Sequence, residues 1–147
     1  MREGGLRVPC IIKWPGKIDN GRVIENFISS LEIFPTLLEI AGVDKPDSIV
    51  IDGFSILPLL TGEKDLARDE MFWEFREEYA ARIGNMKWIK SERREQHNGL
   101  FDLSNDVAEQ NDLSELNPFE YKMVTEKFYS WQEKMAEVEP REPFKDF

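Results

Sequence analysis

Residues 71–90, M-F-W-E-F-R-E-E-Y-A-A-R-I-G-N-M-K-W-I-K, determine the architecture of the second half of this 147-residue chain. Three short segments in this stretch are rich in the aromatic and β-branched residues that favour strands: residues 71–76, 79–83 and 86–90. Gly84-Asn85 is a two-residue turn signal of the II′ kind, which joins antiparallel strands. Residues 100–103 (L-F-D-L) predict a fourth strand, so we expect a small antiparallel sheet.

A long amphipathic helix is predicted after these strands. Asn117 is a favoured cap, Pro118 suits the first helical position, and Glu120 stands three residues after the cap. Apolar residues then step by four, three, four and three along one face: Val124, Phe128, Trp131, Met135 and Val138. Pro140 is expected to end the helix. The favoured interpretation is that this stripe covers the protein's own sheet; a partner-binding face is the alternative.

The first half of the chain predicts a strand followed by a helix. Residues 8–14 (V-P-C-I-I-K-W) are almost continuously apolar, which is typical of a strand buried on both faces of a parallel sheet. From Ser29 the apolar residues fall at helical intervals, Ser29 and Glu32 form a capping-box pattern, and Gly42 suits a left-handed helix end. Pro35 predicts a kink or a first turn of 3₁₀ type.

A brief second helix and a boundary follow. Residues 55–61 (S-I-L-P-L-L-T) predict the helix, and Gly62 ends it. Residues 63–70 (E-K-D-L-A-R-D-E) are highly charged and are expected to be exposed to solvent. This charged stretch is the best candidate for a linker between two parts of the chain.

The overall composition excludes several classes of function. Hydrophobic residues make up 41% of the chain and aromatic residues 12%, which indicates a folded protein rather than a disordered one. The net charge of −10 repels nucleic acid phosphates and anionic lipids, so neither is expected as a partner. No apolar run approaches the roughly 18 residues of a membrane span. The amino terminus lacks the apolar core of a signal peptide, so we expect no targeting segment on this chain.

Few residues are candidates for chemistry. The single cysteine, Cys10, excludes an internal disulfide, and its place in the predicted buried strand indicates a small, inert core residue. The single histidine, His97, lies in a charged loop and is expected to be solvated. Asp19-Asn20-Gly21 predicts a turn rather than a metal loop, because cation sites need several convergent oxygens. On these residues alone, we predict no metal site and no catalytic constellation.

Five further stretches form a series along the chain. They are E-G-G-L-R-V-P-C-I-I-K-W-P-G (3–16), I-S-S-L-E-I-F-P-T-L-L-E-I-A-G (28–42), D-G-F-S-I-L-P-L-L-T-G (52–62), A-R-I-G-N-M-K-W-I-K (81–90) and L-F-D-L-S-N-D-V-A-E-Q-N-D-L (100–113). This series closely resembles the sulfatase family, in the family's order and at its usual spacing. The part that it resembles is the carboxy-terminal third of a sulfatase.

The resemblance implies an α/β fold for the first part of the chain and an α+β fold for the second. Sulfatases have a large α/β domain of the alkaline-phosphatase type, followed by a small four-stranded antiparallel sheet with a packed carboxy-terminal helix. Residues 1–62 would then be the end of the catalytic domain, with a strand at residues 8–14 and the helix after it. Residues 63–70 would be the linker, and residues 71–147 the small carboxy-terminal subdomain.

The resemblance also implies a chemistry that this chain lacks. Sulfatases hydrolyse sulfate esters with a formylglycine, made from the Cys or Ser of a C/S-x-P/A-S-R motif, and with a bound calcium. Cys10 is followed by Ile-Ile-Lys, so it does not match that motif. The family's Asp-Asn metal pair precedes the E-G-G segment, whereas Asp19-Asn20 follows it. We therefore expect no catalytic residue and no metal ligand here, and calcium and formylglycine in the complete parent.

Four residues are expected near the parent's active site, and they are Glu3, Gly4, Gly5 and Arg7. The resemblance implies a truncated sulfatase that is inactive alone; the alternatives are a phosphonate or phosphate monoester hydrolase and a non-catalytic interaction module. The expected partners are the parent's sulfate ester and the missing amino-terminal part of the domain, or a second copy through the unpaired sheet. Relatives of this kind point to a periplasmic or extracellular parent, while the chain itself indicates no compartment.

Overall fold

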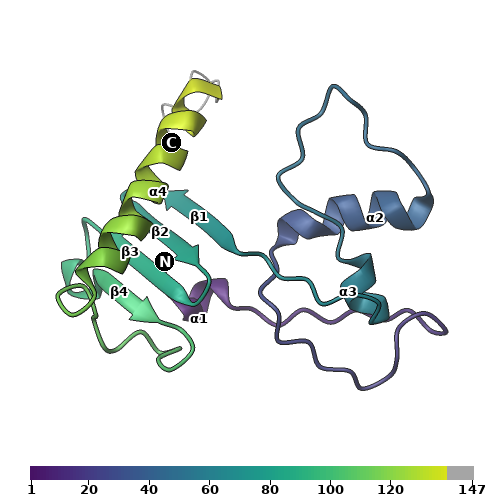
Figure 1. Cartoon of the computed structure of the whole chain (residues 1–147), viewed down its shortest axis with the longest axis horizontal. Helices are drawn as coiled ribbons and strands as arrows, with labels where there is room; N and C mark the ends of the chain where they lie inside the picture. The colour runs from purple at the N-terminus through teal and green to yellow at the C-terminus, as the bar shows by residue number, and fades with distance from the viewer. Residues whose placement is uncertain (139–147) are drawn as a thin grey trace. The chain divides into compact units, whose positions relative to one another are not determined.

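The computed structural model describes residues 1–138, and this part of the chain forms two compact units (Figure 1). Residues 10–69 form the helical unit, and residues 1–9 with residues 70–138 form the sheet unit. The division at residue 70 adjoins the predicted linker. Residues 1–9 make their contacts within the sheet unit. Within residues 1–138, no helix is long and apolar enough to cross a membrane.

Four strands form an antiparallel sheet in chain order. They are β1 (Glu70–Phe75), β2 (Glu78–Ile83), β3 (Met86–Ser91) and β4 (Gly99–Asp102). The register places Ala80 opposite Trp73 on one side and opposite Ile89 on the other. The predicted strands are confirmed, with ends that differ by a residue or two. Gly84 has a φ of 56° and Asn85 has no positive φ, which is the II′ geometry predicted for the β2–β3 turn.

Helix α4 (Pro118–Val138) lies across one face of this sheet (Figure 1). The alternation of the strands sends one residue from each to this face: Phe72, Ala81, Trp88 and Leu100. Phe128 of the helix is fully buried among them, and the ring of Trp131 stacks on that of Phe72 with 5.5 Å between centroids. Val124, Phe128 and Trp131 of the stripe therefore cover the protein's own sheet, as predicted. Pro140, the predicted helix end, lies outside the described residues.

The opposite face of the sheet is covered by the start of the chain. Ala80, Ile89 and Phe101 are buried there, and Met1 and Trp73 pack against them. The short helix α1 (Glu3–Leu6) follows directly in the chain. Because it covers a second apolar face, the amino-terminal segment completes a three-layer arrangement with the sheet in the middle.

The loop between β4 and α4 is held by carboxylates that accept backbone hydrogen bonds. Asp112 Oδ1 accepts from the N–H of Leu100 at 2.9 Å and from the N–H of Ser114 at 2.9 Å. Burial acts to raise the pKa of Asp112, but the hydrogen bonds from Ser114 and Leu100 outweigh it, so the net pKa lies below its ordinary value. Hydrogen bonds donated by Ser104 and Asn105 likewise lower the pKa of Asp102.

These lowered pKa values predict acid sensitivity of the sheet unit. Asp102 and Asp112 bind protons less readily in the folded state than in the unfolded state, where an aspartate has a pKa near 3.8. The stabilisation is therefore complete above that value and is lost as the pH falls through the folded pKa. We expect the free energy of unfolding, measured in urea between pH 7 and pH 3, to decrease below about pH 4.

The matched comparison is between two aspartates. Asp112→Asn is expected to flatten the acid limb of this curve, because its carboxylate no longer titrates. Asp44→Asn removes a negative charge from an exposed loop position of the helical unit and should leave the limb unchanged. Equal slopes for the wild type and Asp112→Asn would contradict the assignment.

The helical unit contains η1 (Ser30–Glu32), α2 (Ile33–Ala41) and α3 (Leu57–Thr61). The predicted capping box is present: the Ser29 side chain accepts from the N–H of Leu31, and the Glu32 carboxylate accepts from the N–H of Ser29. The first turn is of 3₁₀ type, one of the two outcomes predicted from Pro35. Gly42 and Gly62 end the helices with φ values of 64° and 82°, as their positions predict.

Glu32 is the polar centre of this unit. Its side chain is fully buried and accepts hydrogen bonds from the Arg68 guanidinium, whose Nε lies 3.1 Å away. Thr36 Oγ1 donates to the Glu32 carbonyl at 2.6 Å and accepts from the N–H of Ile56 at 3.0 Å, so α2 is joined to α3. Ile56, Leu59 and Leu60 form the small apolar core beside this network.

Two predictions for the first half of the chain are wrong. Residues 8–14 form no strand, and Cys10, predicted to be a buried core residue, is exposed. The reason is physical: a strand exists through backbone hydrogen bonds to a neighbouring strand, and the described residues 10–69 include none. The apolar residues of the segment consequently face solvent, and Ile11 is 93% exposed.

Candidate functional site

The four residues expected near an active site lie together at the amino-terminal end of the sheet unit. Glu3, Gly4 and Gly5 are in α1, and Arg7 follows as its C-cap, with its N–H donating to the Glu3 carbonyl at 2.7 Å. Their exposures differ: Glu3 is buried, whereas Gly4, Gly5 and Arg7 are exposed. The segment therefore has an anchored residue at its start and an open surface immediately after it.

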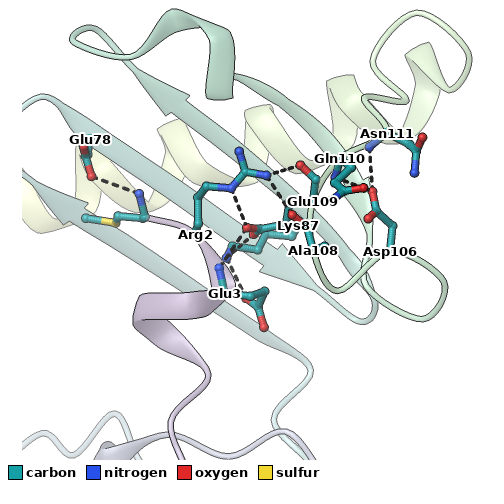
Figure 2. Close-up of polar contacts among 10 residues, drawn as sticks. Arg2, Glu3, Glu78, Lys87, Asp106, Ala108, Glu109, Gln110 and Asn111 are labelled. Atoms are coloured by element: carbon teal, nitrogen blue, oxygen red, sulfur yellow. Dashed lines mark hydrogen bonds and ion pairs between the residues drawn. The ribbon is translucent and has the colours of Figure 1, made fainter.

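Glu3 is anchored by a buried lysine of the sheet. Lys87, in β3, has a fully buried side chain, and its Nζ lies 2.7 Å from Glu3 Oε1 and 2.7 Å from Glu109 Oε1 (Figure 2). The Glu3 and Glu109 side chains are 7% and 1% exposed. A buried charge is stable in a protein when it is paired, and here one ammonium is shared by two carboxylates.

Arg2 adds a second cation to this cluster. Its Nε lies 3.2 Å from Glu109 Oε2, and its guanidinium also donates to the carbonyls of Ala108 and Glu109 (Figure 2). Glu109 Oε2 also accepts from the N–H of Glu3 at 2.9 Å. Both oxygens of Glu109 are therefore engaged, one by Lys87 and the other by the amino-terminal segment. We call Arg2, Glu3, Lys87 and Glu109 the ionic cluster.

A further cationic residue, Arg82, lies near the ionic cluster. Arg82 pairs with Lys87 in the β2–β3 register and lies on the same face of the sheet. Burial lowers the pKa of its guanidinium, while the charge of Glu3 raises it and that of Arg7 lowers it. Arg82 stays protonated at neutral pH because an arginine titrates far above it. Glu3 thus lies within a predominantly cationic environment.

A hollow of about 510 Å³ opens beside the segment. Its lining includes Gly4, Gly5, Trp73, Phe75, Arg94 and His97. A Cβ placed on Gly4 or Gly5 would meet nothing within 4 Å, so the two glycines border open space. His97, which was expected to be solvated, is half-buried and lines this hollow. The lining therefore combines aromatic side chains of β1 with charged side chains of both signs: Arg2, Arg94 and Glu78.

Three residues of the ionic cluster are not among the predicted site residues: Arg2, Lys87 and Glu109. Lys87 carried a weak signal: in a strand, Met86, Trp88 and Lys90 share one face, so Lys87 and Ile89 point to the other, which a second layer must cover. Glu109 carried none, because it lies in a loop and its backbone has a φ of 54°, a conformation that normally favours glycine. The sequence therefore locates the segment but not the residues that hold it.

The described residues do not fit a calcium site. Within residues 1–138 there is no group of three or more His, Cys, Asp or Glu side chains placed to hold a metal ion. Glu3 and Glu109, the buried carboxylates nearest the hollow, are already paired with Lys87 and Arg2. Cys10 lies in an extended segment of the helical unit and is not followed by a Pro-Ser-Arg sequence.

One protein family matches all of the residues that the structure describes. The family described as "N-sulphoglucosamine sulphohydrolase, C-terminal" matches residues 1–138. Steryl-sulfatase of Mus musculus is 38% identical over 73 residues, which cover 50% of this chain and 12% of the relative. Arylsulfatase A of Homo sapiens is 38% identical over 91 residues, which cover 58% of this chain and 18% of the relative. The chain thus matches less than a fifth of the length of these curated relatives.

A solved structure confirms the fold. The crystal structure of Ps i-CgsB in complex with k-i-k-neocarrahexaose superposes with a TM-score of 0.67 at 22% identity, covering 80% of this chain and 27% of that one. At this identity the likeness establishes the fold alone. The four-stranded antiparallel sheet with its carboxy-terminal helix and the family match over residues 1–138 lead to one conclusion. The chain belongs to the sulfatases, in the family of N-sulphoglucosamine sulphohydrolase carboxy-terminal domains.

Proposed function

We propose that this chain supplies part of the substrate-facing wall of a sulfatase, an enzyme that hydrolyses sulfate esters. The observation that carries the proposal is the family match, which begins at residue 1 and includes the segment with Glu3, Gly4, Gly5 and Arg7. In the structure the same segment borders a hollow lined by aromatic side chains, by Arg2 and Arg94, and by the carboxylate of Glu78. A sulfate ester combines an anionic group with an organic group, and such a lining suits both.

The proposed division of the chain follows from the same resemblance. Residues 1–62 would be the end of the α/β catalytic domain, residues 63–70 a linker, and residues 71–147 the small subdomain. Sulfatases generally depend on a formylglycine nucleophile and a metal ion, which stabilises charge on the sulfuryl oxygens. The described residues supply neither, so in this proposal both belong to the rest of a complete sulfatase.

The rest of that domain is also the proposed partner of the helical unit. Ile33, Phe34 and Leu37 of α2 are each more than half exposed, although the helix is strongly apolar. An apolar helix face of this kind is typical of an element built to be covered by other parts of a domain. Self-association of the chain through the same surface and through residues 8–14 is the alternative, and sedimentation of the purified chain distinguishes the two.

We expect the 147-residue chain alone to hydrolyse no aryl sulfate above background. Loss of the nucleophile alone can reduce the turnover of a hydrolase by about 10⁶, and here the metal ligands are absent from the described residues as well. The measurement is release of a phenol from an aryl sulfate, with and without added calcium. Cys10→Ala is the control: turnover that disappears in this variant would make Cys10 a nucleophile and contradict the proposal.

The proposal itself is tested on the reading frame upstream of the Met1 codon. The longer polypeptide encoded there should contain a C/S-x-P/A-S-R sequence and hydrolyse a sulfate ester. Aryl phosphate and phosphonate esters are assayed in parallel, because hydrolysis of these alone would indicate a phosphate or phosphonate monoester hydrolase. A frame without the nucleophile sequence, and without activity on any of the three, would favour a non-catalytic interaction module.

A further inference from the structure

We propose that Lys87 and Glu109 are positioning residues, which fix the amino-terminal segment of residues 2–7 on the small sheet. The inference deepens the proposed function and rests on it in one respect: the segment becomes part of a substrate-facing wall only if the chain serves a sulfatase. In this view the small subdomain sets the position of that wall. Its contribution is made through the ionic cluster, without any contact of Lys87 with the substrate.

The contacts join the segment directly to these two residues. The Lys87 ammonium joins Glu3 to Glu109 with two distances of 2.7 Å, and Glu109 in turn accepts from the N–H of Glu3 and from Arg2 (Figure 2). Glu109 therefore holds the segment through backbone and side chain together. Because Glu3 is the first residue of α1, fixing it also fixes the direction in which Gly4 and Gly5 follow.

The chemistry of the cluster favours positioning over simple stabilisation. Burying a charge costs hydration energy, which the attraction to its partner must offset. Apolar residues of similar size therefore often stabilise a protein as much as a buried ion pair does, or more. A sheet face already lined by Ile89 and Phe101 could be covered by apolar side chains alone. Four paired charges instead impose one register and one orientation on the segment, because any shift leaves a buried charge without its partner.

The backbone at Glu109 supports the same conclusion. Its φ of 54° lies in the left-handed region, where glycine is favoured and a side chain is strained. The loop is shaped partly by Asp106, whose carboxylate accepts from the N–H groups of Gln110 and Asn111 (Figure 2). Glycine would suit the backbone conformation of this turn better than glutamate. We therefore attribute the glutamate at position 109 to the contacts of its carboxylate.

Hydrogen exchange of the full 147-residue chain tests the positioning role. In Glu109→Gly, the backbone conformation is kept and the carboxylate is removed. We expect amide exchange in residues 2–7 to accelerate about tenfold or more, whereas exchange in β3 and α4 changes much less. Arg76→Gly is the matched control, because Arg76 also has a positive φ, 56°, and lies outside the cluster. It should leave exchange in residues 2–7 unchanged.

Lys87→Met provides a second variant of similar shape without the charge. It should release residues 2–7 in the same way, and Lys127→Met, which breaks the exposed pair with Glu70, should not. If exchange in residues 2–7 stays slow in Glu109→Gly, or accelerates equally in the segment, β3 and α4, the cluster has no positioning role and the inference is overturned. The Glu109→Gly comparison decides this even if Lys87→Met does not fold.

The enzymatic consequence is measured on the longer polypeptide described above. Glu109→Gly should lower kcat/KM for its ester at least several-fold relative to Arg76→Gly when both are assayed well below their melting temperatures. Unchanged kcat/KM in a variant whose segment is released would overturn the link between the segment and the substrate. If the longer polypeptide hydrolyses no sulfate ester, the proposed function fails, whereas the exchange experiment still decides the positioning role.

Discussion

Replacing Phe128 by alanine is expected to lower the free energy of unfolding of the sheet unit by about 3–5 kcal/mol. The Phe128 ring is fully buried and makes close ring contacts with aromatic residues from the sheet and from its own helix: Phe72, Tyr79, Trp88, Tyr129 and Trp131. Truncation leaves a cavity between α4 and the sheet in addition to the lost burial. Urea unfolding followed by tryptophan fluorescence measures the change.

The same helix offers a matched control. Phe119→Ala removes an identical side chain from α4 at a position that is 77% exposed, so it should change the free energy of unfolding by less than about 0.5 kcal/mol. Similar losses for the two variants would show that α4 does not pack on the sheet through Phe128. That result would contradict the three-layer arrangement of the sheet unit.

Gly53→Ala is expected to destabilise the helical unit by about 3 kcal/mol, at the upper end of the cost of overpacking. A Cβ on Gly53 would lie 2.0 Å from the Leu31 carbonyl oxygen and 2.5 Å from its carbon. Both are backbone atoms of η1, so no side-chain rotation relieves the clash. The hydrogen bonds of Glu32 and Thr36 would have to shift with these atoms. Hydrogen exchange of the α2 amides measures the local loss.

The control for this substitution is another glycine. Gly4→Ala introduces a Cβ in open space within α1, where alanine is a better helix former than glycine, so stability should not fall. If Gly53→Ala preserves the protection of α2, the close approach of residue 53 to η1 is not a feature of the folded protein. Because the clash is with backbone, no compensating side-chain substitution is expected to rescue it.

The elements that the sequence predicts well are those with local causes. The sheet follows from alternating segments joined by Gly84-Asn85, and α4 follows from a stripe that repeats over five positions. The capping box at Ser29 and the left-handed glycines at positions 42 and 62 depend on residues within a few positions of one another. Local rules of this kind need no knowledge of the rest of the fold.

The predictions that failed depend on distant residues. Residues 8–14 have the composition of a buried strand, but a strand also needs a partner, and composition alone does not provide one. Cys10 and His97 were misplaced for related reasons, since their exposure depends on what packs beside them. The four expected site residues are brought together, yet their anchor involves Lys87 and Glu109, whose charges a sequence pattern would place in solvent.

During synthesis, the ionic cluster can form only after residue 109 has been made. Glu3 and Lys87 are 84 positions apart, and Glu3 and Glu109 are 106 apart. Residues 2–7 are therefore synthesised before their partners and wait until residues 87 and 109 have been made. At about 5–20 residues per second, that delay is of the order of five to twenty seconds. During it, the charged residues of the segment lack the partners that bury them in the folded protein.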